Sequence, residues 1–194
     1  MTDTDDGEPR SERAPLPGPP LVRPADGDTT GGGTAGPVVF VCAACGAALT
    51  RPLIGLPEVP EAPFPEFADD EEPGPSPPTV PAGHYAVETE PYGAPLVVSE
   101  VPRRAMPRYG TIGAGDGHTG CLVSRGPRGN IVVDPDDARG LELVHVSSAC
   151  CGATPTGGMN QRCACGTFVA TLSSDCWVPY ELHLSAAHVR PVHL

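Results

Sequence analysis

This 194-residue sequence contains no lysine, few aromatic residues and no long apolar run. Only 5% of the residues are aromatic, against 26 prolines and 24 glycines, so the chain offers little material for a large core. No stretch approaches the roughly 18 apolar residues that a membrane-spanning helix needs. The acidic start MTDTDDGEPR is followed by no apolar segment, which argues against a secretory signal peptide. We therefore expect a cytoplasmic protein that contacts no membrane.

Basic charge is also scarce. The chain has 12 Lys and Arg residues, all of them arginine, against 24 Asp and Glu residues, and its formal net charge is -12. Such an excess of negative charge repels nucleic acids and anionic membrane surfaces at long range. The basic cluster of Arg103, Arg104 and Arg108 is too small for a nucleic-acid footprint. We therefore expect that the chain does not bind nucleic acid. The sequence does not identify its actual partner, which could be a protein.

Two segments have the composition of disordered chain. Residues 1–37 hold seven acids, seven prolines and seven glycines, and residues 52–82 hold ten prolines, seven acids and no base. Neither segment can bury enough apolar surface to offset the entropy lost on ordering. We predict a disordered tail over 1–37, and a single zinc-stabilised β-rich domain over 38–194 that a disordered acidic, Pro-rich linker interrupts at about 55–80.

Short runs rich in β-branched and aromatic residues, separated by turn residues, occupy the rest of the chain. They lie at 38–41, 84–89, 95–99, 121–124, 130–133, 141–147, 167–172 and 180–184. We predict a mainly β fold with a small antiparallel sheet and zinc-ribbon-like knuckles, in which CLVSRGPRGNIVV (121–133) is a hairpin around RGPRGN. Helical signal is limited to 134–140, where Asp134 as a cap, Pro135 and the terminal Gly140 predict a single turn.

The eight cysteines carry most of the chemical information. In a reducing cytoplasm, cysteines bind metal or take part in redox reactions more often than they form disulfides. VFVCAACGAALT places two residues between Cys42 and Cys45 and puts Gly46 directly after them. Such a turn forms a knuckle whose thiolates point at one ion about 2.3 Å away, and glycine accepts the backbone conformation that follows. The motif predicts half of a tetrahedral zinc site.

Candidates for the other half lie in ACCGATPTGG (149–158) and RCACG (162–166). Cys150 and Cys151 are adjacent and point to opposite sides of an extended strand, and Gly152 favours Cys151 as the ligand. Cys163 and Cys165 point to the same side, so either or both could bind. The predicted ligands are Cys42, Cys45 and two of Cys151, Cys163 and Cys165, with Cys150 and Cys176 in reserve, around one structural Zn²⁺ per chain.

VCAACGAALTRPL, the acidic Pro-rich spacer, VPAGHYAV, CCG and CACGTFVATLSSDCW resemble segments of a group of uncharacterised actinobacterial cysteine-rich proteins. The likeness covers the cysteine-bearing ends and the edge of the middle of the chain. It implies a zinc-ribbon-like site and supplies no substrate. The chain departs from ordinary zinc ribbons in having CxC where a second CxxC is expected.

The sequence is compatible with two alternative functions from different classes. The first is a non-catalytic zinc-binding module that contacts another protein, because four thiolates leave the metal no open position for substrate. The second is an enzyme that uses an open metal site or a reactive cysteine, with His118 and Cys121 as base and nucleophile, or a thiol redox protein. A redox CxxC needs a low-pKa thiolate at a helix N-terminus, and the strand context of Cys45 argues against it. We favour the first and predict no catalytic residue.

One further motif and two single cysteines have plainer interpretations. GAGDGHTG (113–120) contains GxGxxG, but a strand follows where a dinucleotide site needs a helix, so no such cofactor is expected. Cys121 and Cys176 are predicted to be small buried hydrophobes, which is the common environment of free cysteine.

Overall fold

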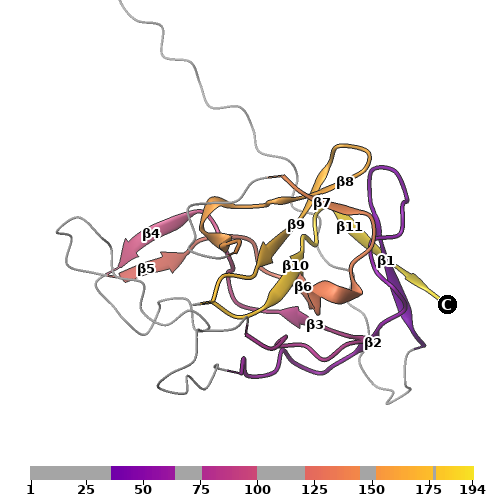
Figure 1. Cartoon of the computed structure of the whole chain (residues 1–194), viewed down its shortest axis with the longest axis horizontal. Helices are drawn as coiled ribbons and strands as arrows, with labels where there is room; N and C mark the ends of the chain where they lie inside the picture. The colour runs from indigo at the N-terminus through magenta and orange to yellow at the C-terminus, as the bar shows by residue number, and fades with distance from the viewer. Residues whose placement is uncertain (1–35, 64–75, 100–120, 145–151, 177) are drawn as a thin grey trace, which may run out of the picture. The chain divides into compact units, whose positions relative to one another are not determined.

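The computed structural model describes residues 36–63, 76–99, 121–144, 152–176 and 178–194 (Figure 1). Residues 1–35 of the predicted tail, residues 64–75 of the predicted linker and residues 100–120 lie outside this part of the chain. The fold is mainly β and its strands are largely antiparallel, as predicted. Most predicted strands are present, and three strands that the sequence did not indicate join them.

A seven-stranded sheet forms the centre of the described fold (Figure 1). Its pairs are antiparallel except the short pair at one edge, β2 with β3, which is parallel. In spatial order the strands are β2 (Ile54–Gly55), β3 (His84–Glu88), β6 (Asn130–Val133), β10 (Glu181–Leu184), β9 (Phe168–Ser173), β8 (Gln161–Cys163) and β7 (Leu141–Leu143).

Two smaller antiparallel pairs accompany this sheet. β1 (Val38–Cys42) pairs with β11 (Val189–His193), which joins the two ends of the described chain. β4 (Leu96–Ser99) pairs with β5 (Cys121–Ser124). The sequence did not indicate β2, β8 or β11, because β2 is two residues long, β8 is the polar run QRC and β11 contains a proline.

The predicted hairpin over 121–133 is wrong. Strand β6 has β3 on one edge and β10 on the other, so it has no free edge for β5, which pairs with β4 instead. The segment β3–β4 runs antiparallel to β5–β6 along a bent ribbon, in which the Arg125 N–H donates to the Pro95 carbonyl at 2.8 Å. At the bend, a Cβ on Gly126 would lie 2.1 Å from the Tyr92 carbonyl oxygen. RGPRGN is therefore a bend within a ribbon, where two backbones approach too closely for any side chain.

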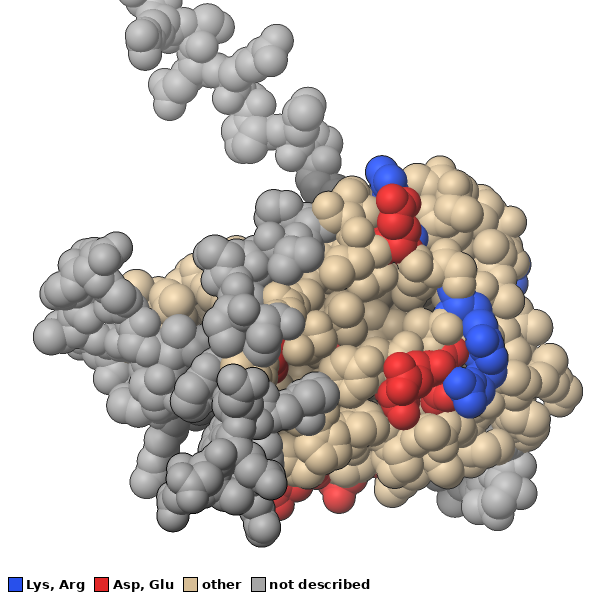
Figure 2. All heavy atoms as spheres, in the orientation of Figure 1, with Lys and Arg blue, Asp and Glu red and all other residues tan. Residues whose placement is uncertain are grey.

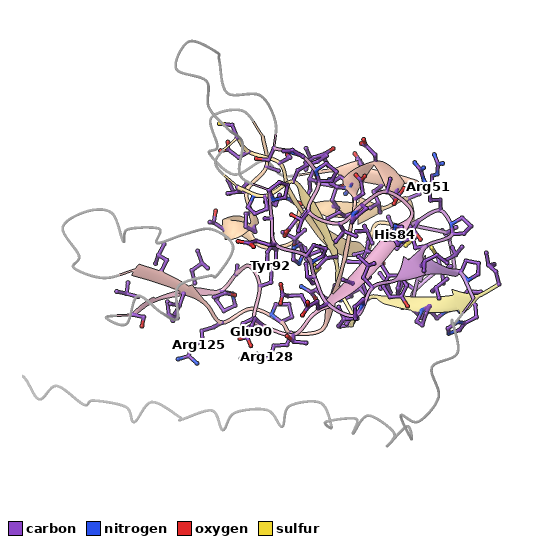
Figure 3. The ribbon with its side chains drawn as sticks, turned by 90° about the horizontal axis from the view of Figure 1, so that it is seen from below. Arg51, His84, Glu90, Tyr92, Arg125 and Arg128 are labelled. Atoms are coloured by element: carbon purple, nitrogen blue, oxygen red, sulfur yellow. The ribbon has the colours of Figure 1, made fainter. Side chains whose placement is uncertain are left out.

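The outer side of this bend is polar and exposed. Arg128 Nη1 donates to the Thr89 carbonyl at 2.8 Å and to Glu90 Oε2 at 3.2 Å, and Figure 3 shows Arg128 and Glu90 together below Tyr92. Turn residues at 125–130 thus connect two sheets rather than two paired strands.

One face of the seven-stranded sheet forms the hydrophobic core together with β1. The rings of Phe40 on β1 and Tyr85 on β3 meet edge to face, with centroids 5.0 Å apart. Cys42 and Cys163, at the ends of β1 and β8, belong to the same buried cluster. Its other members are Val38, Phe40, Leu49, Leu53, Ile131, Val133, Val169, Ala170, Leu182, Leu184 and Val189. The core therefore brings the ends of β1 and β8 close together.

The opposite face of the sheet is also buried and is partly polar. Along β10, Leu182 and Leu184 alternate with Glu181 and His183, and all four side chains are buried. His183 Nε2 lies 2.7 Å from Glu181 Oε2, and the Tyr92 ring stacks on the imidazole with centroids 3.3 Å apart. Both faces of the central strands are thus covered.

The single helical turn predicted at 134–140 is confirmed. It is the 3-10 turn η2 (Pro135–Asp137), and the Asp134 side chain accepts from the Asp136 N–H at 2.9 Å. A second short turn is η3 (Pro155–Gly157). The fully buried Asp137 accepts from the Gly83 N–H and lies 2.8 Å from Arg51 Nε. This ion pair ties the segment after β1 to η2.

The flanks of the predicted linker belong to the described fold. The Leu56 N–H donates to the Tyr85 carbonyl at 2.8 Å, and the Thr79 N–H donates to the Tyr180 carbonyl at 3.3 Å. Val80 is fully buried. Both flanks of the predicted linker therefore contact the sheet at these residues, and 64–75 lie outside the described residues.

Candidate metal centre

The first cysteine turn follows β1. Strand β1 ends at Cys42, and the Cys42 N–H donates to the Ala47 carbonyl at 2.9 Å, while the Gly46 N–H donates back to the Cys42 carbonyl at 2.8 Å. Gly46 has a φ of 78°, in the left-handed region that favours glycine. The turn leaves Cys42 buried and Cys45 exposed.

The second cysteine turn follows β8 and has the same pattern with one residue fewer. The Cys163 N–H donates to the Thr167 carbonyl at 2.9 Å, and the Gly166 N–H donates back to the Cys163 carbonyl at 2.8 Å. Gly166 has a φ of 92°. Here too the first cysteine is buried and the second, Cys165, is exposed. The CxC spacing therefore shortens the knuckle and keeps its hydrogen bonds.

The two turns lie side by side (Figure 1) and bring four sulfur atoms within 4.8 Å of one another. Cys42 Sγ lies 3.8 Å from Cys165 Sγ, and Cys45 Sγ lies 3.6 Å from Cys163 Sγ. A tetrahedral ion with metal–sulfur bonds of about 2.3 Å separates its ligands by about 3.8 Å. A disulfide would need about 2.05 Å, and all four cysteines are free thiols. The four thiols form a potential metal site whose spacing fits a tetrahedral ion.

The surroundings of the sulfur atoms favour binding of a cation. The Thr167 hydroxyl, 3.4 Å from the sulfur, and the Thr167 N–H lower the pKa of Cys165 to about 6. The Cys165 N–H lowers the pKa of Cys163, but burial and the neighbouring thiols outweigh it and raise the value to about 12. The Ala47 N–H lowers the pKa of Cys45, and the Cys165 thiol reverses this to a net rise. The thiols thus compete for charge, and a bound metal ion would let all four ionise.

The structure brings together four of the five predicted ligands, namely Cys42, Cys45, Cys163 and Cys165. Cys151, the fifth candidate, and Cys150 in reserve lie outside the described residues. Cys176, the other reserve, is buried away from this group, with its Sγ 3.8 Å from Asp175 Oδ1. Glycine follows Cys165 as it follows Cys45, which favoured Cys165 as a ligand, but it also follows Cys151, so this signal alone did not separate the candidates.

The alternative catalytic site, which pairs His118 with Cys121, falls outside the side chains that the structure describes. Cys121 begins β5, but its side chain and the loop with His118 lie outside the part that the structure describes.

Arg190 lies beside the first turn although the sequence did not single it out. It stands opposite Val41 on β11, and its Nη2 is 3.8 Å from where a Cβ on Gly46 would lie. A guanidinium so close can offset part of the negative charge that four thiolates bring.

Within the described residues, no helix combines the length and the apolar character needed to cross a membrane. Comparisons with protein-family models, curated proteins and solved structures gave no match to this chain. The resemblance to actinobacterial cysteine-rich proteins therefore stays a prediction from the sequence.

Proposed function

We propose that this protein is a non-catalytic zinc-binding module whose β-rich domain contacts another protein. The observation that carries the proposal is the set of four sulfur atoms on two matching turns, with separations of 3.6 and 3.8 Å across the turns. Tetrahedral sites made only of thiolates bind zinc or iron. Zinc is the proposed ion because pairs of Cys-Gly turns are typical of closed structural zinc sites.

A structural role follows from the number of ligands. Four protein thiolates complete the tetrahedral coordination of Zn²⁺, so neither water nor substrate has an open position on the ion. Two of the thiols are buried in the core cluster, which makes the ion continuous with the core. The metal would act by holding the fold together.

Zinc would join distant parts of the chain. Cys45 and Cys163 are 118 positions apart, and the entropy of closing such a loop costs about 4 kcal/mol. Zinc binding in small modules contributes roughly 10 to 16 kcal/mol, so it exceeds this cost. Because the chain has few aromatic residues for its core, we expect the fold to depend on the metal.

A module whose metal has no open coordination position cannot bind a substrate through that metal. Its role would therefore be to contact a partner protein. Strand β4 exposes two neighbouring valines, Val97 at 38% and Val98 at 52%, whose side chains point to opposite faces of the strand. We expect a partner to cover the face that carries Val98, the more exposed of the two.

Elemental analysis of the purified protein tests the proposal. We expect one zinc per chain in the wild type, loss of zinc in Cys45→Ser and Cys163→Ser, and retention in the control Ala44→Ser, which changes an exposed residue of the same turn. A coloured, iron-containing protein would refute zinc but keep the metal site. A metal-free protein whose thermal stability ignores strong chelators, or one that isolates with a Cys42–Cys165 disulfide, would refute the proposal.

A further inference from the structure

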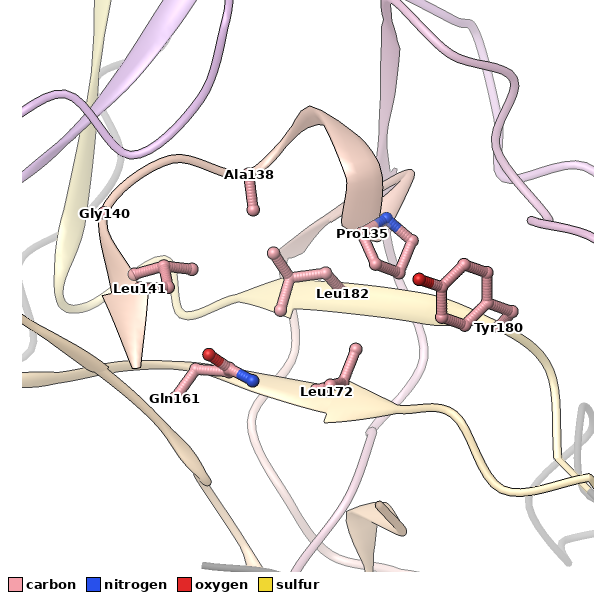
Figure 4. Close-up of a pocket in the computed structure, with 8 residues that line it drawn as sticks. All are labelled: Pro135, Ala138, Gly140, Leu141, Gln161, Leu172, Tyr180 and Leu182. Carbon is pink, nitrogen blue, oxygen red and sulfur yellow. The ribbon is translucent and has the colours of Figure 1, made fainter. Parts of the chain in front are cut away.

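A cavity of about 290 Å³ lies between η2 and the β7–β10 end of the sheet (Figure 4). Figure 2 shows the surface of this face hollowed, with acidic and basic side chains on its borders. The cavity is on the core side of the sheet and is distinct from the cysteine site, although strand β8 carries residues of both. Its lining residues are Pro135, Ala138, Gly140, Leu141, Gln161, Leu172, Tyr180 and Leu182.

Gln161 is the polar group at the base of this cavity. It is only 6% exposed, and Figure 4 shows its carboxamide facing the space between Leu141, Leu172 and Leu182. Within the described residues no protein group forms a hydrogen bond with this carboxamide, and its polar atoms reach the solvent of the cavity rather than being fully buried. A ligand that enters the cavity and replaces this water can therefore take up both the donor and the acceptor of the amide, each neutral hydrogen bond contributing about 0.5 to 1.5 kcal/mol.

The neighbouring Asn160 shows what a structural amide looks like at the same strand end. Asn160 Nδ2 donates to the Leu172 carbonyl at 2.9 Å, and the Leu172 N–H donates to Asn160 Oδ1 at 2.7 Å. Both halves of that amide are used within the fold. The Gln161 residue is buried to a similar degree, but its amide makes no such pair of hydrogen bonds within the described fold and faces the solvent of the cavity.

The cavity walls define the rest of the ligand. Leu141, Leu172 and Leu182 provide an apolar surface, and Tyr180 adds an aromatic wall whose hydroxyl lies 3.4 Å from Asp136 Oδ1. Burial, with the charge of Asp136, raises the pKa of Tyr180, so its hydroxyl stays neutral at physiological pH. The nearby carboxylate disfavours an anion in the cavity.

We propose that this cavity binds a small uncharged molecule with an apolar body and a carboxamide edge, which exchanges paired hydrogen bonds with Gln161. The volume is at the lower end of ligand pockets, which span about 300 to 1,000 Å³, so the ligand is a small aromatic amide or a single peptide unit. The site stands apart from the metal proposal. The cross-strand neighbour of Leu141 is Cys163, so a metal at the cysteine site would steady one wall.

Titration of the full-length protein, followed by amide NMR, tests this site with two probes. Benzamide represents a free small amide, and N-acetyl-leucine N-methylamide represents a peptide backbone. We expect at least one of them to shift the signals of β8–β10, and benzoate to bind more weakly because of its charge. Binding of benzamide alone identifies the small amide as the ligand type, and binding of the leucine derivative alone identifies the peptide unit.

Two variants and a control connect binding to the cavity. Gln161→Met keeps the side-chain length but removes the amide, and should weaken binding by about tenfold, the worth of two neutral hydrogen bonds. Ala138→Leu should fill the cavity and abolish binding. Arg162→Gln, which removes an exposed ion pair with Glu142, should bind as the wild type does.

Either of two results overturns the site. One is that neither probe shifts the wild-type spectrum at about 10 mM, a concentration that detects even millimolar dissociation constants. The other is that binding survives unchanged in both Gln161→Met and Ala138→Leu, whose dispersed amide spectra would show that they are folded.

Discussion

The two cysteine turns achieve the same geometry with different lengths. In the first, the Gly46 N–H returns to Cys42 across four residues, and in the second the Gly166 N–H returns to Cys163 across three. Both turns place a glycine in the left-handed region and leave one thiol buried and one exposed. The comparison indicates that the closing hydrogen bond and the glycine define a metal knuckle, and that the number of residues between the cysteines can vary.

The largest effect expected is from breaking either turn. Cys45→Ser and Cys163→Ser should each abolish metal binding and destabilise the domain by at least about 5 kcal/mol, because the proposed ion would link both turns to one core. Hydrogen exchange should rise around the opposite turn in each variant, and Ala44→Ser should leave it unchanged. If Cys45→Ser leaves exchange around Cys163 as it is in the wild type, the two turns do not share a metal.

The next effect concerns the glycines that close the turns. Gly46→Ala and Gly166→Ala should each cost about 1 to 2 kcal/mol, since alanine is strained at positive φ. A Cβ would meet no atom closer than 3.8 Å at Gly46 and none within 4 Å at Gly166, so backbone conformation is the whole cost. Chemical denaturation should give equal losses for the two.

Gly126→Ala provides the contrast for these two variants. Its Cβ would lie 2.1 Å from backbone, so the loss of stability should clearly exceed that of either turn glycine. Equal losses in all three would show that close backbone approach does not set the bend of the ribbon.

A smaller effect is expected from Thr167, the polar neighbour that distinguishes the second cysteine turn from the first. The Thr167 hydroxyl lowers the pKa of Cys165 to about 6, so this thiolate resists protonation as the pH falls. Thr167→Val should raise that pKa, and protons should then displace the metal at a higher pH than in the wild type. Metal release against pH, followed with a chromophoric chelator, measures the shift. Thr156→Val, at an exposed site in η3, should leave the release curve in place.

The smallest effect concerns Arg190 beside the first turn. Arg190→Gln should weaken metal affinity by only a few-fold, because the guanidinium is exposed and screened by salt. Competition with a chelator at low and high salt should show the difference fading as salt rises. Arg128→Gln, which removes an exposed ion pair at the ribbon bend, is the matched control and should leave affinity unchanged.

Much of the local structure could be read from the residues. Apolar and β-branched runs predicted strands at 38–41, 84–89 and 130–133, where β1, β3 and β6 lie. Asp134, Pro135 and Gly140 predicted one helical turn, and η2 occupies it. Such signals are local because strand propensity and capping depend on neighbours in the chain.

The sequence could not predict which strands pair with one another, and the reason is physical. RGPRGN between two apolar runs looks like a hairpin turn, yet β6 is buried along its whole length and needs a neighbour on each edge. Those neighbours come from 84–88 and 181–184, far away in the sequence. Likewise, nothing in the run QRC predicts a strand, because β8 is held by β7 and β9 rather than by its own propensity.

The candidate site likewise has features that the sequence predicted and features that only the fold decided. The sequence by itself determined the chemistry: cysteines followed by glycine, in short turns after strands, predict thiolate knuckles for a metal. Only the tertiary structure decided that the turn at Cys42 and Cys45 meets the turn at Cys163 and Cys165, because the core buries the ends of β1 and β8 together. It also decided that the amide of Asn160 is paired within the fold while that of Gln161 faces a cavity, since hydrogen-bond partners are set by the folded neighbours and not by the residue type.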